Sequence, residues 1–142
     1  MHLFAYGVLI RELATGRAAE LIAPLGPGAP ATVRGALHAL QGKDGGWYPI
    51  LLPDADAGEV HGVVHEASGV DWAGMDEFED ALDGPDPEYR RLPLVVTRSD
   101  GSTLAAQAYC YARQVPEEAE PITCGSFARW LADTGRQPIG LR

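Results

Sequence analysis

The sequence predicts one small domain in which several strands are combined with a few short helices. The chain has 142 residues, a length typical of a single domain with its own core. Hydrophobic residues make up 46% and charged residues 22%, the ordinary balance of a soluble globular protein. Most apolar segments are short and alternate like strands, whereas a few have the period of an amphipathic helix. We therefore expect a single domain over residues 1–142.

Six segments have the composition and alternation of strands. They are expected at residues 3–9, 31–41, 47–53, 59–66, 90–98 and 103–111. The first breaks at Gly7, which permits φ values closed to other residues and lets the backbone come close to a ligand, while a plain strand end with a turn glycine stays open as the alternative. The last two form the clearest hairpin, with Asp100 and Gly101 in the turn between them. On the final strand Tyr109 shares a face with Tyr111.

Three segments are predicted helices, at residues 11–22, 70–82 and 125–134, the last within a C-terminal region at about 124–134. The middle helix has two candidate N-caps, Ser68 and Asp71, and is followed by Gly84 and Pro85. Residues 23–30 are rich in proline and glycine, and residues 115–121 are acidic and bounded by prolines. Both are expected to be irregular connections.

The helix at 70–82 carries a carboxylate on its apolar side. At ~100° per residue, one arc of this helix contains Trp72, Met75, Phe78 and Leu82. Glu79 lies inside that arc. The other acidic residues lie outside it and are expected to be ordinary solvated charges: Asp76, Glu77 and Asp80. A carboxylate among apolar side chains is costly unless it is paired, hydrogen-bonded or protonated, and such positions are typical of catalytic acids and bases. The spacing alone leaves a structural role open, with Glu79 at the rim or paired with an arginine.

Charge and cysteine content restrict the partners and the compartment. The net charge is −9 and there is no run of lysine or arginine, so a nucleic acid or an anionic membrane is not an expected partner. No apolar run approaches the ~20 residues of a membrane span, and the N-terminus lacks the features of a signal peptide. Cys110 and Cys124 have no metal-type spacing. A cytoplasmic protein with free thiols is the simplest interpretation, although one disulfide remains compatible with the sequence.

The histidines do not predict a metal site. His61 and His65 share a face of the strand at 59–66 but stand ~13 Å apart at ~3.3 Å per residue. Zinc requires ligands ~2 Å from one ion. The common hydrolase, dinucleotide and zinc motifs are absent.

Three motifs in a fixed order resemble the γ-glutamylcyclotransferase-like family, in particular its small bacterial and plant branch, which includes γ-glutamylamine cyclotransferases. The first is Tyr6-Gly7-Val8-Leu9, at the end of the first strand. The second is the strand G-E-V-H-G-V-V followed by M-D-E-F-E-D. The third is Tyr89-Arg90-Arg91 followed by a strand, a D-G turn and A-x-A-Y. The resemblance covers about residues 1–113, which we take as the core. It implies a small mixed α+β fold with a curved, barrel-like sheet and helices outside.

The resemblance also implies a reaction and a site. A γ-glutamyl amine or peptide would close on itself to give 5-oxoproline and a free amine, with Glu79 in the place of the family's catalytic glutamate. The turn of Tyr6, Gly7, Val8 and Leu9 would cradle the γ-glutamyl group, and Tyr89 and Tyr109 would line the cavity. The expected partner is this small-molecule substrate, and neither a metal nor a cofactor is required.

Two residues depart from the family pattern. Val8 stands where serine or threonine is usual, and Asp80 stands where glycine is usual. They motivate an alternative, a non-catalytic module that binds an acidic metabolite on the same fold. The leaving amine is not identified by any motif, since the loops expected to contact it, at 42–47 and 82–88, contain none.

Overall fold

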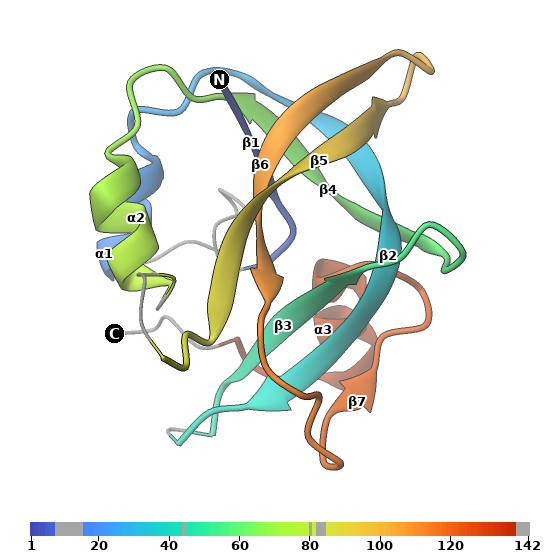
Figure 1. Cartoon of the computed structure of the whole chain (residues 1–142). Helices are drawn as coiled ribbons and strands as arrows, with labels where there is room; N and C mark the ends of the chain where they lie inside the picture. The colour runs from blue at the N-terminus through green and yellow to red at the C-terminus, as the bar shows by residue number, and fades with distance from the viewer. Residues whose placement is uncertain (8–15, 44, 80, 82–84, 139–142) are drawn as a thin grey trace.

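The computed structural model describes residues 1–7, 16–43, 45–79, 81 and 85–138, and in this part of the chain strands form a barrel with helices around it (Figure 1). The strands are β1 (His2–Ala5), β2 (Gly28–Gln41), β3 (Trp47–Pro53), β4 (Glu59–Glu66), β5 (Tyr89–Arg98), β6 (Thr103–Tyr111) and β7 (Glu120–Pro121). The helices are α1 (Gly16–Ile22), α2 (Trp72–Phe78) and α3 (Phe127–Thr134). The predicted α+β class is confirmed.

The barrel closes through the strand order β2-β4-β1-β6-β5, with β5 returning to β2. β1 and β6 are parallel neighbours, whereas β4 is antiparallel to both β1 and β2 and β5 is antiparallel to both β6 and β2. The closing seam pairs Ala31 with Arg98 and Thr32 with Thr97. Closure removes the exposed sheet edges that an open sheet of this size would present. The barrel-like sheet implied by the family resemblance is therefore present.

β2 is the longest strand and belongs to two parts of the sheet. Its first half pairs with β4, and its second half, from Gly35 to Gln41, pairs with β3. A side chain at Gly35 would lie 2.8 Å from the carbonyl oxygen of Leu52, so the absence of a Cβ lets β3 approach closely where β2 changes partner. β7 adds a short pairing to the same half of β2.

Side chains on opposite faces of the strands belong to two apolar clusters. The first joins the strands to α3 and includes Phe4, Tyr6, Val33, Val60, Val96, Ala106, Ala108, Cys110, Phe127 and Trp130. The second joins the opposite strand faces to α1 and α2, which contact each other on one side of the barrel (Figure 1), and includes Leu3, Ala5, Leu21, Ile22, Met75, Tyr89 and Tyr109. Tyr109 and Cys110 therefore face opposite sides, as the alternation predicts.

Several element boundaries differ from the sequence-based expectation. Residues 23–30 were expected to be irregular, but β2 already begins at Gly28 because its backbone pairs with β4 from there. Residues 115–121 contain β7, whose pairing partner is distant in sequence. Of the helix expected at 11–22, the described part is α1, and residues 11–15 lie outside the described residues.

The remaining expectations concern the thiols and the membrane. Cys110 and Cys124 are both free thiols in the structure, so no disulfide joins them there. None of the helices in the described ranges has the length and apolar character required to cross a bilayer.

Candidate active site

Glu79 stands at the C-terminal end of α2, where the helix meets the barrel. Asp71 caps the start of this helix by accepting a hydrogen bond from the Gly74 backbone at 3.0 Å, which confirms one of the two predicted caps. The helix ends at Phe78, earlier than predicted, because the backbone of Glu79 leaves helical geometry with ψ at 2°. The Glu79 N–H still donates to the carbonyl of Met75 at 2.9 Å. The last turn of α2 therefore fixes the position of the Glu79 backbone, from which the side chain extends.

The environment of Glu79 favours its protonated form. Burial of the carboxyl, followed by the negative charge of Glu88, raises the pKa of Glu79 from 4.5 to about 7. Met75 beneath it is fully buried, and Trp72 and Phe78 pack against the same cluster. A carboxyl group with this pKa exchanges protons readily near neutral pH.

Three tyrosines predicted as site residues surround this carboxyl. Tyr6, Tyr89 and Tyr109 are only 6%, 6% and 3% exposed. Burial is the main cause that raises the pKa of each tyrosine, and the negative charge of Glu79 adds to the rise in all three. Glu79 thus lies within electrostatic reach of side chains from the end of β1, from β5 and from β6.

Each of these tyrosines donates its single hydroxyl proton to the protein itself. Tyr6 donates to the backbone carbonyl of Tyr109. Tyr89 donates to the Pro49 carbonyl at 2.9 Å, and Tyr109 donates to Oδ1 of Asp76 at 2.7 Å. Because a hydroxyl has one proton and two lone pairs, the three oxygens keep acceptor capacity. Together with the carboxylate of Glu79 they form a group of acceptors suited to an ammonium group.

Gly7 comes directly after Tyr6 and packs against β3. A Cβ added at Gly7 would lie 2.9 Å from Cδ of Pro49 and closer still to its Cγ. The neighbour that leaves no room for a side chain at Gly7 is this proline ring, and the predicted approach of the Gly7 backbone to a ligand stays a prediction. Val8 and Leu9, the remaining residues of the predicted cradle, lie outside the described residues, as do Asp80 and Leu82.

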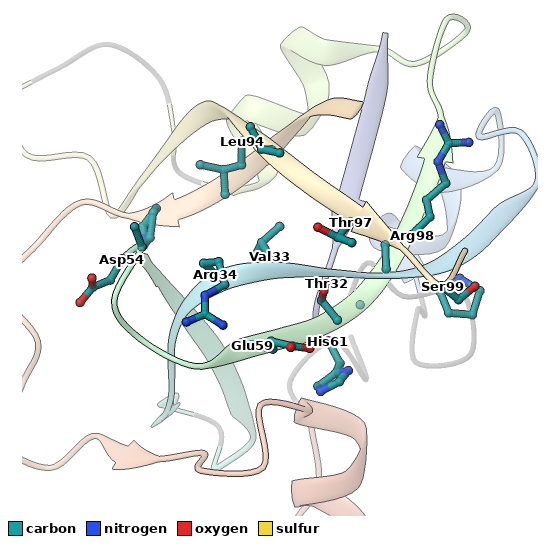
Figure 2. A pocket seen from close by; sticks show the side chains of 16 residues that line it. Thr32, Val33, Arg34, Asp54, Glu59, His61, Leu94, Thr97, Arg98 and Ser99 are labelled. Atoms are coloured by element: carbon teal, nitrogen blue, oxygen red, sulfur yellow. The ribbon is translucent and has the colours of Figure 1, made fainter. Parts of the chain in front are cut away.

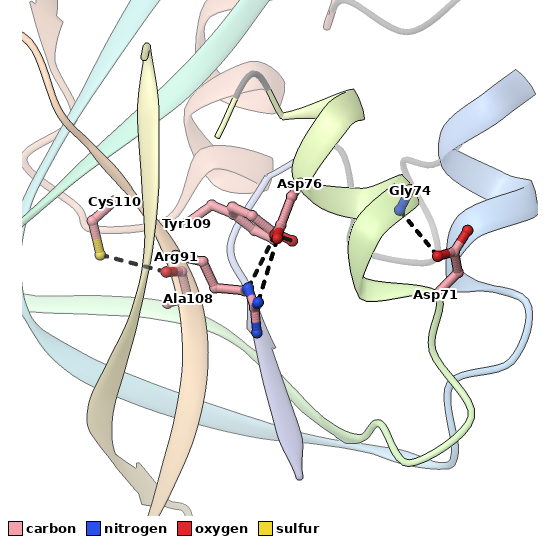
Figure 3. A network of polar contacts seen from close by, with 7 residues as sticks. All are labelled: Asp71, Gly74, Asp76, Arg91, Ala108, Tyr109 and Cys110. Atoms are coloured by element: carbon pink, nitrogen blue, oxygen red, sulfur yellow. Dashed lines mark hydrogen bonds and ion pairs between the residues drawn. The ribbon is translucent and has the colours of Figure 1, made fainter. Parts of the chain in front are cut away.

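Asp76 is not the ordinary solvated charge that the helical wheel predicted. Its Oδ1 accepts from Arg91 Nε at 3.0 Å, its Oδ2 accepts from Arg91 Nη2 at 3.3 Å, and Tyr109 donates to Oδ1 (Figure 3). The Asp76 and Arg91 side chains are 19% and 27% exposed. The guanidinium also lies 4.7 Å from the centre of the Trp72 ring. The prediction was wrong because a wheel describes one helix and omits the β5–β6 wall beside it. We call these contacts the Arg91–Asp76–Tyr109 bridge.

A second carboxylate near the site was not singled out from the sequence. Glu88 accepts a hydrogen bond from the Tyr48 hydroxyl at 2.8 Å, and its charge contributes to the raised pKa of Glu79. Tyr48 belongs to β3 and Glu88 directly precedes β5, so no local pattern links them. The loop at 82–88 was expected to contact the leaving amine, but it contains no motif that could have identified Glu88.

A separate hollow lies elsewhere on the barrel (Figure 2). It has a volume of about 790 Å³ and is lined by residues of β2, β4, β5 and the adjoining loops. Its charged lining side chains are of both signs: Arg34, Asp54, Glu59 and Arg98. None of the predicted site residues that the structure describes lines it. The hollow and the Glu79 site are therefore different features of the molecule.

Comparison with known proteins identifies the family. A family model described as gamma-glutamyl cyclotransferase, AIG2-like, matches residues 3–130. The chain belongs to this family. The match extends beyond the expected core of 1–113 and ends at Trp130, inside α3.

Solved structures agree with the cyclotransferase-family fold. A structure named gamma-glutamyl cyclotransferase has a TM-score of 0.67 at 18% identity, covering 97% of this chain and 88% of its own. An uncharacterized protein from Pyrococcus horikoshii has a TM-score of 0.67 at 13% identity, with 95% and 96% covered. An AIG2-like protein from Mus musculus has a TM-score of 0.59 at 25% identity, with 82% and 80% covered. A search of curated protein sequences returns no match.

Proposed function

We propose that this protein is a cyclotransferase that converts a γ-glutamyl amine or γ-glutamyl peptide into 5-oxoproline and a free amine, with Glu79 as general base and then general acid. The observation that carries the proposal is the partly buried Glu79 side chain, whose carboxyl pKa of about 7 suits both proton transfers at neutral pH. Membership of the gamma-glutamyl cyclotransferase, AIG2-like family supports the class of reaction.

The reaction requires one proton to move twice. The Glu79 carboxylate takes a proton from the α-ammonium group of the substrate, and the freed amine nitrogen attacks the γ-carbonyl carbon. A new C–N bond closes the five-membered ring and leaves an oxyanion on that carbon. When the oxyanion collapses, the original C–N amide bond breaks and protonated Glu79 returns the proton to the departing nitrogen. The attacking nitrogen still carries a second extra proton in this intermediate, and it releases that proton to water as the lactam forms. The products are 5-oxoproline and the free amine, which takes up a proton from water at neutral pH, and no cofactor takes part in the balance.

The tyrosines would orient the substrate. Tyr6, Tyr89 and Tyr109 are neutral, and each already donates its proton, so their oxygens are available to accept from the α-ammonium group. Ring closure is intramolecular, so holding the ammonium beside Glu79 and folding the chain supplies much of the rate enhancement. Backbone N–H groups after Gly7 would bind the α-carboxylate or the oxyanion, as the family resemblance implies.

The same proposal covers partners and location. The partner is a small γ-glutamyl compound, and the net charge of −9 argues against nucleic acid and anionic membrane surfaces. We propose a cytoplasmic location, where such metabolites are available.

The test is a search for product. Purified protein is incubated with a panel of γ-glutamyl amines and γ-glutamyl dipeptides, and 5-oxoproline is measured by mass spectrometry. Wild type releases 5-oxoproline from at least one substrate, and Glu79→Gln lowers kcat by about 10²- to 10⁴-fold, the usual contribution of general acid–base catalysis. Glu77→Gln is the matched control, since Glu77 is an exposed glutamate in the same helix.

Two results would contradict the proposal. Absence of 5-oxoproline with every substrate excludes the reaction, and ligand binding that is equal in wild type and Glu79→Ala then favours the non-catalytic module. Product release that survives Glu79→Gln unchanged excludes Glu79 as the acid–base residue.

A further inference from the structure

We propose that the Arg91–Asp76–Tyr109 bridge positions Glu79 for catalysis, so that Asp76 and Arg91 are positioning residues of this active site. The inference rests on the proposed role of Glu79. It assigns a function to a charged cluster that does not itself have to touch the substrate.

The bridge fixes the last turn of α2, which leads directly into Glu79. α2 has seven residues, a length at which an isolated helix is not stable in water, so contacts with other elements must fix it. Asp71 secures its first turn, and its last turn contains no basic residue. Asp76 lies three residues before Glu79, which is the spacing of neighbours on one helix face. The polar contacts of Asp76 with β5 and β6 are therefore made in the turn that leads into Glu79.

The geometry of the bridge is well suited to positioning. Arg91 reaches Asp76 with two separate nitrogens, one for each carboxylate oxygen, and this forked pairing restricts orientation as well as distance. The Tyr109 hydroxyl adds a third contact from the neighbouring strand. Stacking of the guanidinium on Trp72, at the first position of α2, ties the other end of the helix to the same arginine. α2 thus has little freedom to rotate or slide along the barrel wall.

Tyr109 connects the bridge to the other half of the site. Its side chain donates to Asp76, while its backbone carbonyl accepts from the hydroxyl of Tyr6. Tyr6 directly precedes Gly7, the start of the predicted substrate cradle. One residue of β6 therefore sets the location of both the catalytic glutamate and the N-terminal turn, which is what a reaction within one folded substrate requires.

Positioning and simple electrostatics make opposite predictions for Arg91. In the described part of the chain, the groups whose charge or pKa is coupled to Glu79 are Tyr6, Glu88, Tyr89 and Tyr109. Asp76 and Arg91 are the charged groups of the bridge, joined to Tyr109 through the Asp76 carboxylate. If the bridge acted only through its charges, removing Asp76 would lower the pKa of Glu79 and removing Arg91 would raise it. If the bridge keeps the end of α2 against the barrel, either change lets water reach Glu79, and its pKa falls toward 4.5 in both variants.

The experiment compares Asp76→Asn and Arg91→Met with two matched controls, Glu77→Gln and Arg90→Met, which alter exposed neighbours on the same helix and the same strand. Steady-state kinetics are measured between pH 5.5 and 9. We expect kcat to fall about 10- to 100-fold in both bridge variants, the scale of a displacement of about 1 Å, while KM changes by less than about threefold. In both bridge variants the fall of kcat/KM on the acid side of the pH profile, the acid limb, moves to lower pH. The double variant loses no more kcat than either single variant. The controls keep the wild-type profile.

Two milder variants keep the test decisive if a single change prevents folding. Arg91→Lys retains the positive charge but loses the forked contact, and Tyr109→Phe removes one hydroxyl while the Arg91–Asp76 pair remains. Both should lower kcat by smaller factors and shift the acid limb in the same direction. An acid limb that rises in Arg91→Met and falls in Asp76→Asn would show a purely electrostatic role. Lower stability with unchanged kcat and an unchanged acid limb would show a merely structural role. Either result overturns the inference.

A direct titration separates this inference from the proposed function. The carboxyl carbon of Glu79 is followed by ¹³C NMR and assigned by its loss in Glu79→Gln. If no substrate yields 5-oxoproline, the proposed function fails, while a common fall of the Glu79 pKa in both bridge variants still establishes that the bridge holds this carboxyl. If the Glu79 titration is unchanged in both variants, the inference fails whatever the activity.

Discussion

Replacing Glu79 with glutamine should stabilise the folded protein above neutral pH. The folded protein holds the Glu79 proton up to a pKa of about 7, whereas the unfolded chain releases it near 4.5. Between these values the folded state binds more protons than the unfolded state, so raising the pH costs stability. At about 1.4 kcal/mol for each tenfold change in the protonation equilibrium, the full penalty is about 3 kcal/mol. It is absent well below pH 4.5 and complete above pH 7, and glutamine does not incur it.

The assay is urea unfolding of wild type, Glu79→Gln and the exposed control Glu77→Gln at pH 8 and pH 5.5. The lower pH stays above the isoelectric point of about 4.7, near which the protein carries little net charge. We expect Glu79→Gln to be more stable than wild type by about 3 kcal/mol at pH 8 and by about 1.5 kcal/mol at pH 5.5. With a urea m-value of about 1–3 kcal/mol/M, the midpoint at pH 8 rises by about 1–3 M. Glu77→Gln should change little at either pH.

Equal stability of wild type and Glu79→Gln at pH 8 would refute this reasoning. It would mean that the Glu79 carboxylate is fully solvated in the folded protein, or that other contacts offset the cost of its burial. The argument for Glu79 as a base with a raised pKa would then lose its physical foundation, even if the family assignment stood.

Three further predictions concern activity, packing and reactivity. The kcat/KM for 5-oxoproline release should fall below an apparent pKa of about 7, because protonated Glu79 cannot accept the ammonium proton; a flat profile from pH 5.5 to 8 contradicts this. Gly7→Ala should lose about 1–3 kcal/mol in urea unfolding, because its Cβ would overlap the Pro49 ring, whereas Gly58→Ala, which has open space around its Cβ, should not. Cys110 is 1% exposed and burial raises its pKa to about 12, so a thiol reagent at pH 8 should modify it only after unfolding; rapid labelling of both thiols in the native protein is the contrary result.

The local elements were predictable where short-range signals are strong. The strands expected at 47–53, 59–66 and 103–111 are confirmed with the same boundaries, because each is a short run of strand-forming residues bounded by turn residues or prolines. α3 is confirmed as well, with Ser126 as N-cap and Gly135 in the left-handed conformation at φ 71° as C-cap. In these segments the pattern and the backbone preferences agree.

Errors occurred where a distant segment decides the outcome. The start of β2 at Gly28 depends on pairing with β4, and β7 depends on pairing with β2. The α2 helix ends at Phe78 although the apolar pattern continues beyond it. Asp76 was misjudged because its partners come from strands that follow it in the chain. None of these contacts leaves a signal in the residues nearby.

The candidate site divides in the same way between sequence and fold. The sequence by itself identified Glu79 as an acidic residue on an apolar arc, and the ordered motifs related it to the turn at Gly7. Only the tertiary structure decided what surrounds that carboxyl. The Tyr6 hydroxyl meets the backbone of Tyr109 across 103 positions of sequence because β1 and β6 are neighbours in the closed barrel. Burial and charge, which raise the pKa of Glu79, depend on distances in space, and these exist only after the barrel has closed.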